Sequence, residues 1–230
     1  MRRTKPYLLT IALVVAAAAG VAKAPDSWDG LVRVKSKNVG AAYLLPNADF
    51  RAYSKVMIDP PQVAFRKNWQ RDFNTSTRTL SGRISDQDVR EAIDGAQVSL
   101  ARIFAENFSR EGYQVATQAG PDVLHLSIAV VNLTVNAPDR ATSARQHSFS
   151  FDAGEATLVI EARDSLTGEL LGRAADRRTT GEGPSYRRTY SSNQADFEAL
   201  FENWARISAR GMTELRASSP VDTEGLRKRR

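Results

Sequence analysis

An alternation of apolar and polar side chains over residues 123–135 constrains the fold of this 230-residue chain more than any other feature. Successive side chains of a strand point to opposite sides of a sheet, so every second residue shares one face. The first face is polar at His125 and Ser127 before it becomes apolar at Val131 and Leu133. The pattern predicts a strand whose second face packs against a core, and the residues of that face are Leu124, Leu126, Ile128 and Val130.

Shorter extended segments accompany this strand. In "YSKVMIDPPQVAF", Val56 and Ile58 alternate with their neighbours before Pro60-Pro61, and Val63 and Phe65 do so after it. Proline cannot donate to a sheet ladder, so this break is expected at a sheet edge or a bulge. Further strands are expected over residues 113–117, 156–162 and 169–175, whereas the rest of 28–65 is expected to be rich in loops and 67–84 to be an exposed loop.

Two amphipathic helices are predicted. The first begins at Ser85, where Asp88 completes a capping box, and it ends at Gly112. Its apolar stripe consists of Val89, Ile93, Ala96, Leu100, Ile103, Phe104 and Phe108. The second begins at an Asn193 cap and ends at Ser218-Ser219-Pro220. Its stripe consists of Phe197, Leu200, Phe201, Trp204, Ile207, Gly211 and Leu215.

The order of these elements is strand, helix, several mostly adjacent strands, and helix. This order predicts an α+β fold, a largely antiparallel sheet with two long amphipathic helices packed on one face. We expect a signal peptide over residues 1–24, a single α+β domain with a loop-rich N-terminal part over 25–217, and a disordered basic tail over 218–230.

Residues 1–24 have the three parts of a secretory signal peptide. Arg2 and Arg3 give a cationic start, residues 7–21 are mostly apolar, and Ala22-Lys23-Ala24 has the A-x-A form of a cleavage site. Cleavage after Ala24 would place Pro25 at the cut, and cleavage after Ala19 would avoid it, so the site stays open. We expect a periplasmic protein, with an uncut leader acting as an inner-membrane anchor as the alternative.

The formal net charge of +6 comes from the two ends of the chain, and residues 25–215 are close to neutral. A nucleic-acid partner requires a clustered basic face, so none is expected. The predicted partner is an envelope protein or an anionic polymer, and contact with a membrane is expected only if the leader is retained.

The sequence contains no cysteine and only two histidines. Disulfides, a thiol nucleophile, a thiolate metal site and a lipidated cysteine are therefore excluded. A zinc site would depend on carboxylates, and we expect neither a metal nor a cofactor.

His125, Ser127 and Asp122 form a hydrolase-like trio in local reach. On a strand, the α-carbons of His125 and Ser127 would lie about 7 Å apart, while a nucleophile and its base need hydrogen-bond contact and an orienting group. We therefore expect no catalytic residue, and a periplasmic hydrolase that uses His125 with Ser127 or a nearby carboxylate is the alternative. His147 has no partner at the spacing of metal ligands.

Two arginine pairs flank Gly181-Glu182-Gly183-Pro184. Arg177 and Arg178 precede this loop, and Arg187 and Arg188 follow it. Guanidinium groups bind anions through forked hydrogen bonds, so an anion-binding loop is one hypothesis. A solvated loop that is charged for solubility is the other, and it is favoured.

The stretch "ARDSLTGELLG" groups Asp164, Thr167, Gly168 and Glu169 within six positions. It lies between two expected strands, so Ser165-Leu166-Thr167-Gly168 is predicted to be a tight turn. Gly168 can take a positive φ, and the side chain of Asp164 can accept hydrogen bonds from backbone amides. A catalytic loop is the less favoured alternative.

Several pieces occur in an order that resembles a known family. They are Trp28-Asp29-Gly30-Leu31-Val32, Tyr43 with Pro46-Asn47-Ala48, "YSKVMIDPPQVAF", "GPDVLHLSIAVVNL", "DSLTGELL" and Trp204-Ala205. The chain resembles the bacterial domain-of-unknown-function family 3313, which consists of exported proteins, many of them lipoproteins. The sequence departs from the lipoprotein members in lacking the lipidation cysteine. The resemblance implies export and, because the family has no established activity, it assigns no catalytic residue. The expected function is that of an exported envelope protein acting as a non-catalytic binding or accessory module.

Overall fold

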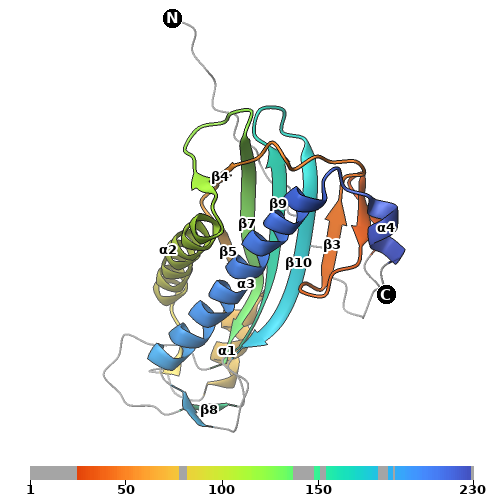
Figure 1. Ribbon diagram of the computed structural model, residues 1–230. Coiled ribbons are helices and arrows are strands. Elements are labelled where there is room, and N and C mark those ends of the chain that lie inside the picture. The colour runs from red at the N-terminus through yellow and green to blue at the C-terminus, as the bar shows by residue number, and fades with distance from the viewer. Residues whose placement is uncertain are drawn as a thin grey trace, which may run out of the picture.

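A nine-stranded mixed sheet carries two long helices, α2 (Asp86–Arg110) and α3 (Tyr190–Ser218), on one face (Figure 1). The computed structural model describes residues 25–77, 82–136, 148–150, 154–180, 186–188 and 190–228. This arrangement confirms the predicted α+β fold with a largely antiparallel sheet. The expected signal peptide, residues 1–24, lies outside the described residues.

Three long strands form the centre of the sheet. They are β7 (Val123–Val135), β9 (Gly154–Asp164) and β10 (Leu170–Thr180), and each pairs with the next in antiparallel fashion. The full order is β1-β2-β3-β10-β9-β7-β4-β6, and β5 also pairs with β7. The bounds of the outer strands are β1 Ser27–Trp28, β2 Leu31–Val34, β3 Ala41–Leu44, β4 Lys55–Ile58, β5 Gln62–Phe65 and β6 Gln114–Val115. A separate two-stranded sheet joins β8 (Ser148–Ser150) to β11 (Tyr186–Arg188).

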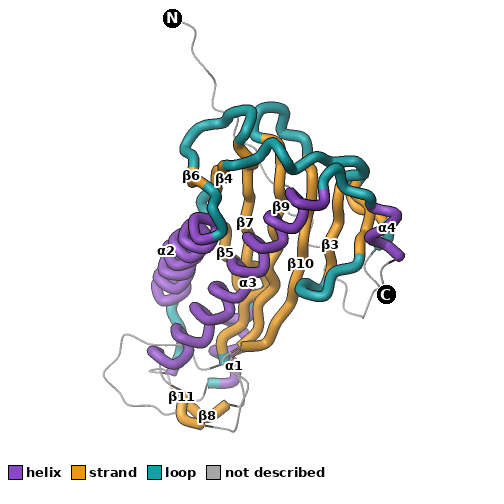
Figure 2. The backbone as a smooth tube through the Cα atoms, viewed as in Figure 1, coloured by secondary structure: helices purple, strands orange, loops and turns teal. Residues whose placement is uncertain are grey.

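The proline break lies at the margin of the sheet, as predicted. Strands β4 and β5 both run parallel to β7 and follow the same side of it, separated by Asp59 and Pro60-Pro61. The amide of Asp59 still donates to the carbonyl of Leu126 at 3.0 Å. Figure 2 shows β4 and β6 at the edge of the sheet next to α2.

The N-terminal part is richer in strands than expected. Strands β1, β2 and β3 form an antiparallel meander that joins the sheet through β10. Each strand is short, and turns with positive φ at Asp29 and Gly30 interrupt the alternation. These strands are stabilised by pairing with β10, a long-range contact that periodicity in a short window cannot reveal.

Helix α2 begins with the predicted capping box. The Ser85 hydroxyl accepts from the Asp88 amide at 3.2 Å, and the Asp88 carboxylate accepts from the Ser85 amide at 2.7 Å. Gly112, with φ of 90°, follows the end of the helix. The predicted stripe is fully buried only in the C-terminal half, at Leu100, Ile103, Phe104 and Phe108, whereas Val89, Ile93 and Ala96 are half-buried.

Helix α3 runs diagonally across β9 and β10 in Figure 1. It begins at Tyr190, before the expected Asn193 cap, because a residue with good capping chemistry does not by itself fix a helix boundary. Its predicted stripe is buried at Phe197, Leu200, Phe201 and Trp204, whereas Ile207, Gly211 and Leu215 are half-buried. Trp204 is fully buried and stacks on Phe201. The indole Nε1 donates to the Asp176 carboxylate of β10 at 2.8 Å, which joins the helix to the sheet.

A short helix, α1 (Trp69–Ser76), replaces part of the loop expected over residues 67–84. Trp69 is buried and stacks on Phe65 with ring centroids 4.2 Å apart. The side chain of Asn74 donates to the Ile84 carbonyl and accepts from the Ile84 amide, closing the segment on itself. The many polar residues of this segment predicted an exposed loop, but the buried side chain of Trp69 anchors it to the domain.

The tail predicted to be disordered from residue 218 is ordered as far as it is described. Helix α4 (Thr223–Lys228) lies beside β2, and Val221 is fully buried in the main core. The Val221 amide and carbonyl bond to the Ala48 carbonyl and the Asn47 amide. Val221 therefore holds this segment in place through its buried side chain and its bonded backbone groups. The prediction of disorder, which was based on the basic residues that follow, is wrong for the part of the segment that is described. Residues 229 and 230 lie outside the described residues.

Candidate functional site

The polar face of β7 carries the candidate hydrolase residues. His125 and Ser127 point away from the helices, because the intervening Leu126 points into the core. Strand β4 pairs in parallel with β7 and places Asp59 beside them. Asp59 Oδ1 lies 2.7 Å from His125 Nε2, and Ser127 Oγ donates to Asp59 Oδ2 at 2.8 Å.

This geometry differs from that of an activated nucleophile. In a serine hydrolase the hydroxyl donates to an imidazole, which is oriented in turn by a carboxylate. Here the carboxylate of Asp59 lies between the other two groups, so the hydroxyl of Ser127 donates to Asp59. The imidazole of His125 is thereby held by the carboxylate, and among the described residues it forms no hydrogen bond with the hydroxyl of Ser127.

Asp122, the carboxylate of the expected trio, belongs to a different cluster. It accepts from the Ser54 hydroxyl at 3.1 Å and pairs with Lys55 at 3.1 Å. The hydrogen bond from Lys55 lowers the pKa of Asp122 below its usual range, even though burial opposes the shift. The structure thus brings Asp59 to His125 in place of Asp122. The one signal in the sequence for Asp59 was its position at the end of a strand, immediately before Pro60-Pro61.

A charge cluster covers the same open face at β9 and β10. Arg173 is only 8% exposed, its Nε donates to Glu161 at 2.8 Å, and its Nη2 donates to Asp29 at 2.9 Å. The guanidinium lies 4.0 Å from the ring centroid of Trp28, and Trp28 also contacts Tyr43 edge to face. Buried ion pairs are costly to break because the partner is left uncompensated, so this cluster fixes β1 against the sheet.

Two of the proposed anion-binding arginines, Arg177 and Arg178, are described, and each has a carboxylate partner. Arg177 pairs with Glu155 at 2.6 Å, which raises the pKa of Arg177, while Arg178 pairs with Asp176 at 2.6 Å. As neighbours on β10, the two arginines point to opposite faces of the sheet. Residues 181–185, the side chains of Arg187 and Arg188, and His147 lie outside the described residues. Anion binding by this group stays a prediction.

Residues 165–169, within the stretch 162–172, form the hairpin turn between β9 and β10. Gly168 has φ of 75°, and Asp164 Oδ1 accepts from the amides of Leu166 and Thr167 at 2.9 and 2.7 Å. The Tyr53 hydroxyl donates to Asp164 Oδ2 at 2.8 Å. The turn interpretation therefore accounts for the carboxylate, the hydroxyl and the glycine that first suggested a catalytic loop.

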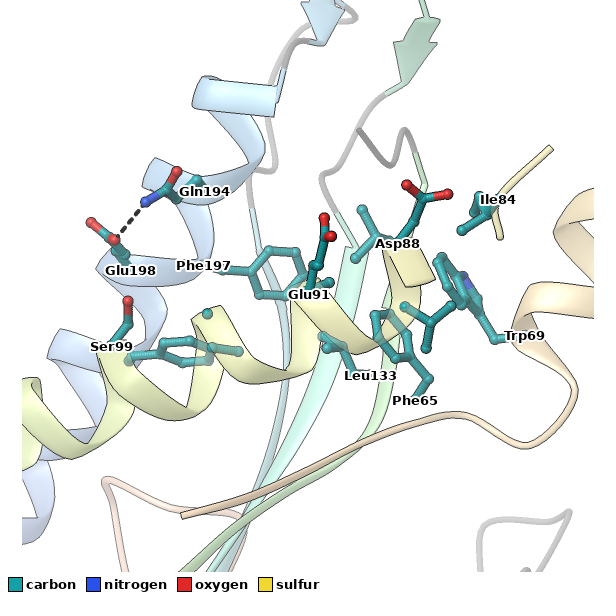
Figure 3. A pocket seen from close by; sticks show the side chains of 16 residues that line it. Phe65, Trp69, Ile84, Asp88, Glu91, Ser99, Leu133, Gln194, Phe197 and Glu198 are labelled. Atoms are coloured by element: carbon teal, nitrogen blue, oxygen red, sulfur yellow. Dashed lines mark hydrogen bonds between the residues drawn. The ribbon is translucent and has the colours of Figure 1, made fainter. Parts of the chain in front are cut away.

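A cleft of about 300 Å³ lies between the N-terminal halves of α2 and α3 (Figure 3). It occupies the position where the apolar stripe of α2 is only half-buried. Its inner wall is apolar and largely aromatic, and it includes Phe65, Trp69, Leu133, Val135, Phe197 and Phe201.

A second cleft, of about 490 Å³, lies on the other side of α3, over the outer strands. Val34, Leu44, Ile160 and Ala174 of the sheet line it, together with Ile207 and Gly211 of α3. A methyl group added at Gly211, or at Gly95 in the α2 wall of the first cleft, would contact no atom within 4 Å. Each cleft thus has a helical glycine in its wall. Neither cleft is lined by His125 or Asp59.

Among the described residues, no three His, Asp or Glu side chains are grouped as metal ligands. None of the helices in the described ranges is long and apolar enough to cross a bilayer.

Comparisons with solved structures give remote likenesses. The chain is 14% identical to a protein titled as the PelC dodecamer from Paraburkholderia phytofirmans, covering 70% of this chain and 95% of that one with a TM-score of 0.32. The chain is 13% identical to a DUF330 protein from Xanthomonas campestris, and the match covers 76% of this chain and 91% of that one with a TM-score of 0.34. It is 10% identical to a DUF4136 family protein from Bacteroides thetaiotaomicron, and that match covers 80% of this chain and 97% of the other with a TM-score of 0.36. Likenesses at such scores carry no inference about function.

A search of curated proteins found no match. The family model described as "Protein of unknown function (DUF3313)" matches residues 18–207, a span that includes the central strands of the sheet, all of α2 and most of α3. The resemblance that the ordered sequence pieces indicated is confirmed. The chain belongs to the DUF3313 family.

Proposed function

We propose that this protein is an exported cell-envelope protein that acts as a non-catalytic binding or accessory module. The observation that carries the proposal is the hydrogen bond from the Ser127 hydroxyl to the Asp59 carboxylate, 2.8 Å long. In a serine hydrolase the nucleophilic hydroxyl donates to an imidazole, whereas the Ser127 hydroxyl donates directly to the Asp59 carboxylate and so lacks that partner. The helical side offers apolar clefts suited to binding.

Export is supported by the sequence of residues 1–24, which has the three parts of a secretory signal peptide. N-terminal sequencing of the native protein from a periplasmic fraction tests it. We expect a chain that begins between residues 20 and 25. Recovery of the protein from the cytoplasm with Met1 intact would contradict export and leave the binding proposal standing.

A periplasmic hydrolase is the second candidate, and the contact of 2.7 Å between His125 and Asp59 favours it. A serine-reactive fluorophosphonate probe tests it on the wild type, on Ser127→Ala and on the matched control Ser54→Ala. Ser54 also donates its hydroxyl to a carboxylate, that of Asp122. We expect no labelling of the wild type. Labelling that disappears in Ser127→Ala and persists in Ser54→Ala would establish the hydrolase instead.

A further inference from the structure

The cleft between α2 and α3 combines an apolar interior with acidic margins on two sides. Figure 3 shows Asp88 and Glu91 on α2, and Glu198 on α3, around the aromatic side chains. The inner wall ends at Trp69, which is 6% exposed and stacked on Phe65. A ligand that fills this cleft therefore contacts aromatic surface in the centre and carboxylates along both helical walls.

Two of these carboxylates have no cationic partner in the described part of the chain. Glu91 accepts from the Gln87 amide group at 2.8 Å, and Glu198 accepts from the Gln194 amide group at 3.0 Å. Both donors are neutral and both lie one turn earlier on the same helix. The negative charges of Glu91 and Glu198 beside the cleft are thus not compensated by a cationic side chain among the described residues.

The apolar surface continues beyond the cleft along α2. Val98 is 71% exposed, and it follows Gly95 by three positions, so the two residues share one side of the helix. Glu91 precedes Gly95 by four positions on the same side. One line along α2 therefore carries a carboxylate, an open glycine position and an exposed apolar side chain.

We propose that this cleft binds a basic amphipathic peptide segment of a partner protein. The inference rests on the proposed function as a binding module and deepens it by naming the chemistry of the partner. Apolar side chains of the segment enter the cleft, and its lysines or arginines pair with Glu91 on one wall and Glu198 on the other. An amphipathic segment laid into an apolar groove between helices is a recurrent mode of recognition.

The charge distribution favours a peptide over other apolar ligands. Acidic groups on both margins repel a fatty acid or another anionic lipid, and a single cationic head group would meet only one of the two walls. The volume of about 300 Å³ is at the small end of ligand cavities, and it suits a few anchoring side chains. Residues 25–215 are close to neutral, so general attraction between net charges does not account for binding of a basic segment.

Isothermal titration of two synthetic helical peptides onto the mature protein tests the proposal. One peptide has leucines on one face and lysines on the other, and the second has glutamates in place of the lysines. We expect the lysine peptide to bind and the glutamate peptide to bind at least about tenfold more weakly. Equal binding of the two peptides would contradict the proposal that the partner segment is basic.

Two glycine variants locate the site. Gly95→Leu places a side chain in the α2–α3 cleft, and Gly211→Leu does the same in the cleft on the other side of α3, with no clash at Cβ in either. We expect Gly95→Leu to weaken binding of the lysine peptide at least about tenfold and Gly211→Leu to leave it unchanged. Circular dichroism checks that both variants fold. If Gly95→Leu has no effect, or if Gly211→Leu is the variant that weakens binding, the peptide does not bind in the α2–α3 cleft and the proposal fails.

A double variant, Glu91→Gln with Glu198→Gln, isolates the carboxylates. We expect it to bind the lysine peptide several-fold more weakly and with a smaller dependence on salt, since screening acts on exposed charges. Unchanged salt dependence would contradict the proposal. If the protein alone self-associates in sedimentation and Gly95→Leu abolishes this, the cleft belongs to a second copy and the proposal fails. Export and the absence of hydrolysis are tested by other measurements, so their outcome is independent.

Discussion

At the scale of the residue, Asp164 organises the turn between β9 and β10. Burial by itself would raise the pKa of its carboxyl, but hydrogen bonds from the Thr167 amide, the Tyr53 hydroxyl and the Leu166 amide outweigh it, and the pKa is lowered. Burial and the same hydrogen bond raise the pKa of Tyr53. The ionised carboxylate is therefore the form that the folded turn selects.

We predict that the contribution of Asp164 depends on pH. Its folded pKa lies below the unfolded value of about 3.9, so the folded state binds fewer protons, and the stabilisation is present above that value and lost as pH falls through the folded pKa. Asp164→Asn keeps one neutral acceptor, the amide oxygen, and should cost about 1 kcal/mol at pH 7. The cost should shrink towards pH 3. Urea unfolding at several pH values measures it.

Glu169→Gln is the matched control, because among the described contacts its exposed carboxylate accepts no hydrogen bond. We expect this variant to have the same stability as the wild type across the range. A cost of Asp164→Asn that is as large at pH 3 as at pH 7 would refute the role of the charge.

Gly168 supplies the backbone conformation of the same turn. Its φ is 75°, and a Cβ would contact no atom within 4 Å, so a side chain is penalised by the backbone alone. We predict that Gly168→Val costs about 1–3 kcal/mol, whereas Gly168→Asn costs less because asparagine tolerates the left-handed region. Chemical denaturation compares the two variants, and equal losses in both would refute this explanation.

At the scale of the element, glycines have opposite roles in a strand and in a helix. A methyl group at Gly154, where φ is 151°, would overlap the carbonyl oxygen of Thr134 on the neighbouring strand. At Gly95, inside α2, it would meet open space. The first glycine permits close approach of β7 and β9, and the second only weakens a helix.

We predict that Gly154→Ala destabilises the protein by about 3 kcal/mol, because backbone strain and overlap with Thr134 add together. Gly95→Ala should stabilise it by about 1 kcal/mol, since alanine has the higher helix propensity. Thermal unfolding of both variants measures the effects. A melting temperature that falls in Gly95→Ala would show that the glycine has a packing role in α2.

At the scale of the whole molecule, the C-terminal segment after α3 closes the domain. Ser219 Oγ accepts from the Phe50 amide at 2.9 Å, and Val221 is buried against the core with both backbone groups bonded to residues near Ala48. The segment thus connects the last helix to the loop before β4 and to β2.

We predict that a chain ending at Ser218 is less stable by at least about 1.5 kcal/mol, the value for burying one valine side chain. A chain ending at Leu226, which lacks only the basic residues 227–230, should lose little. Urea unfolding midpoints of the two truncated chains, compared with that of the full mature chain, measure these losses of stability. Equal midpoints would restore the expectation of a disordered tail.

The sequence by itself determined the parts whose signals are local. The alternation in β7, the capping box of Ser85 and Asp88, and the turn at Gly168 each depend on residues within a few positions of one another. Their physical causes, side-chain periodicity and satisfaction of nearby backbone groups, act within the segment. These elements were therefore predicted correctly.

Only the tertiary structure decided which distant residues meet. Pairing across the sheet placed Asp59 at His125, gave the short strands β1 to β3 a partner in β10, and anchored Val221 under the loop at Ala48. The α2–α3 cleft arises in the same way, because two helices that pack closely at Asn107 and Glu202 leave space at their N-terminal ends. Such contacts depend on the free energy of packing summed over the whole domain, and no single segment of sequence contains that quantity.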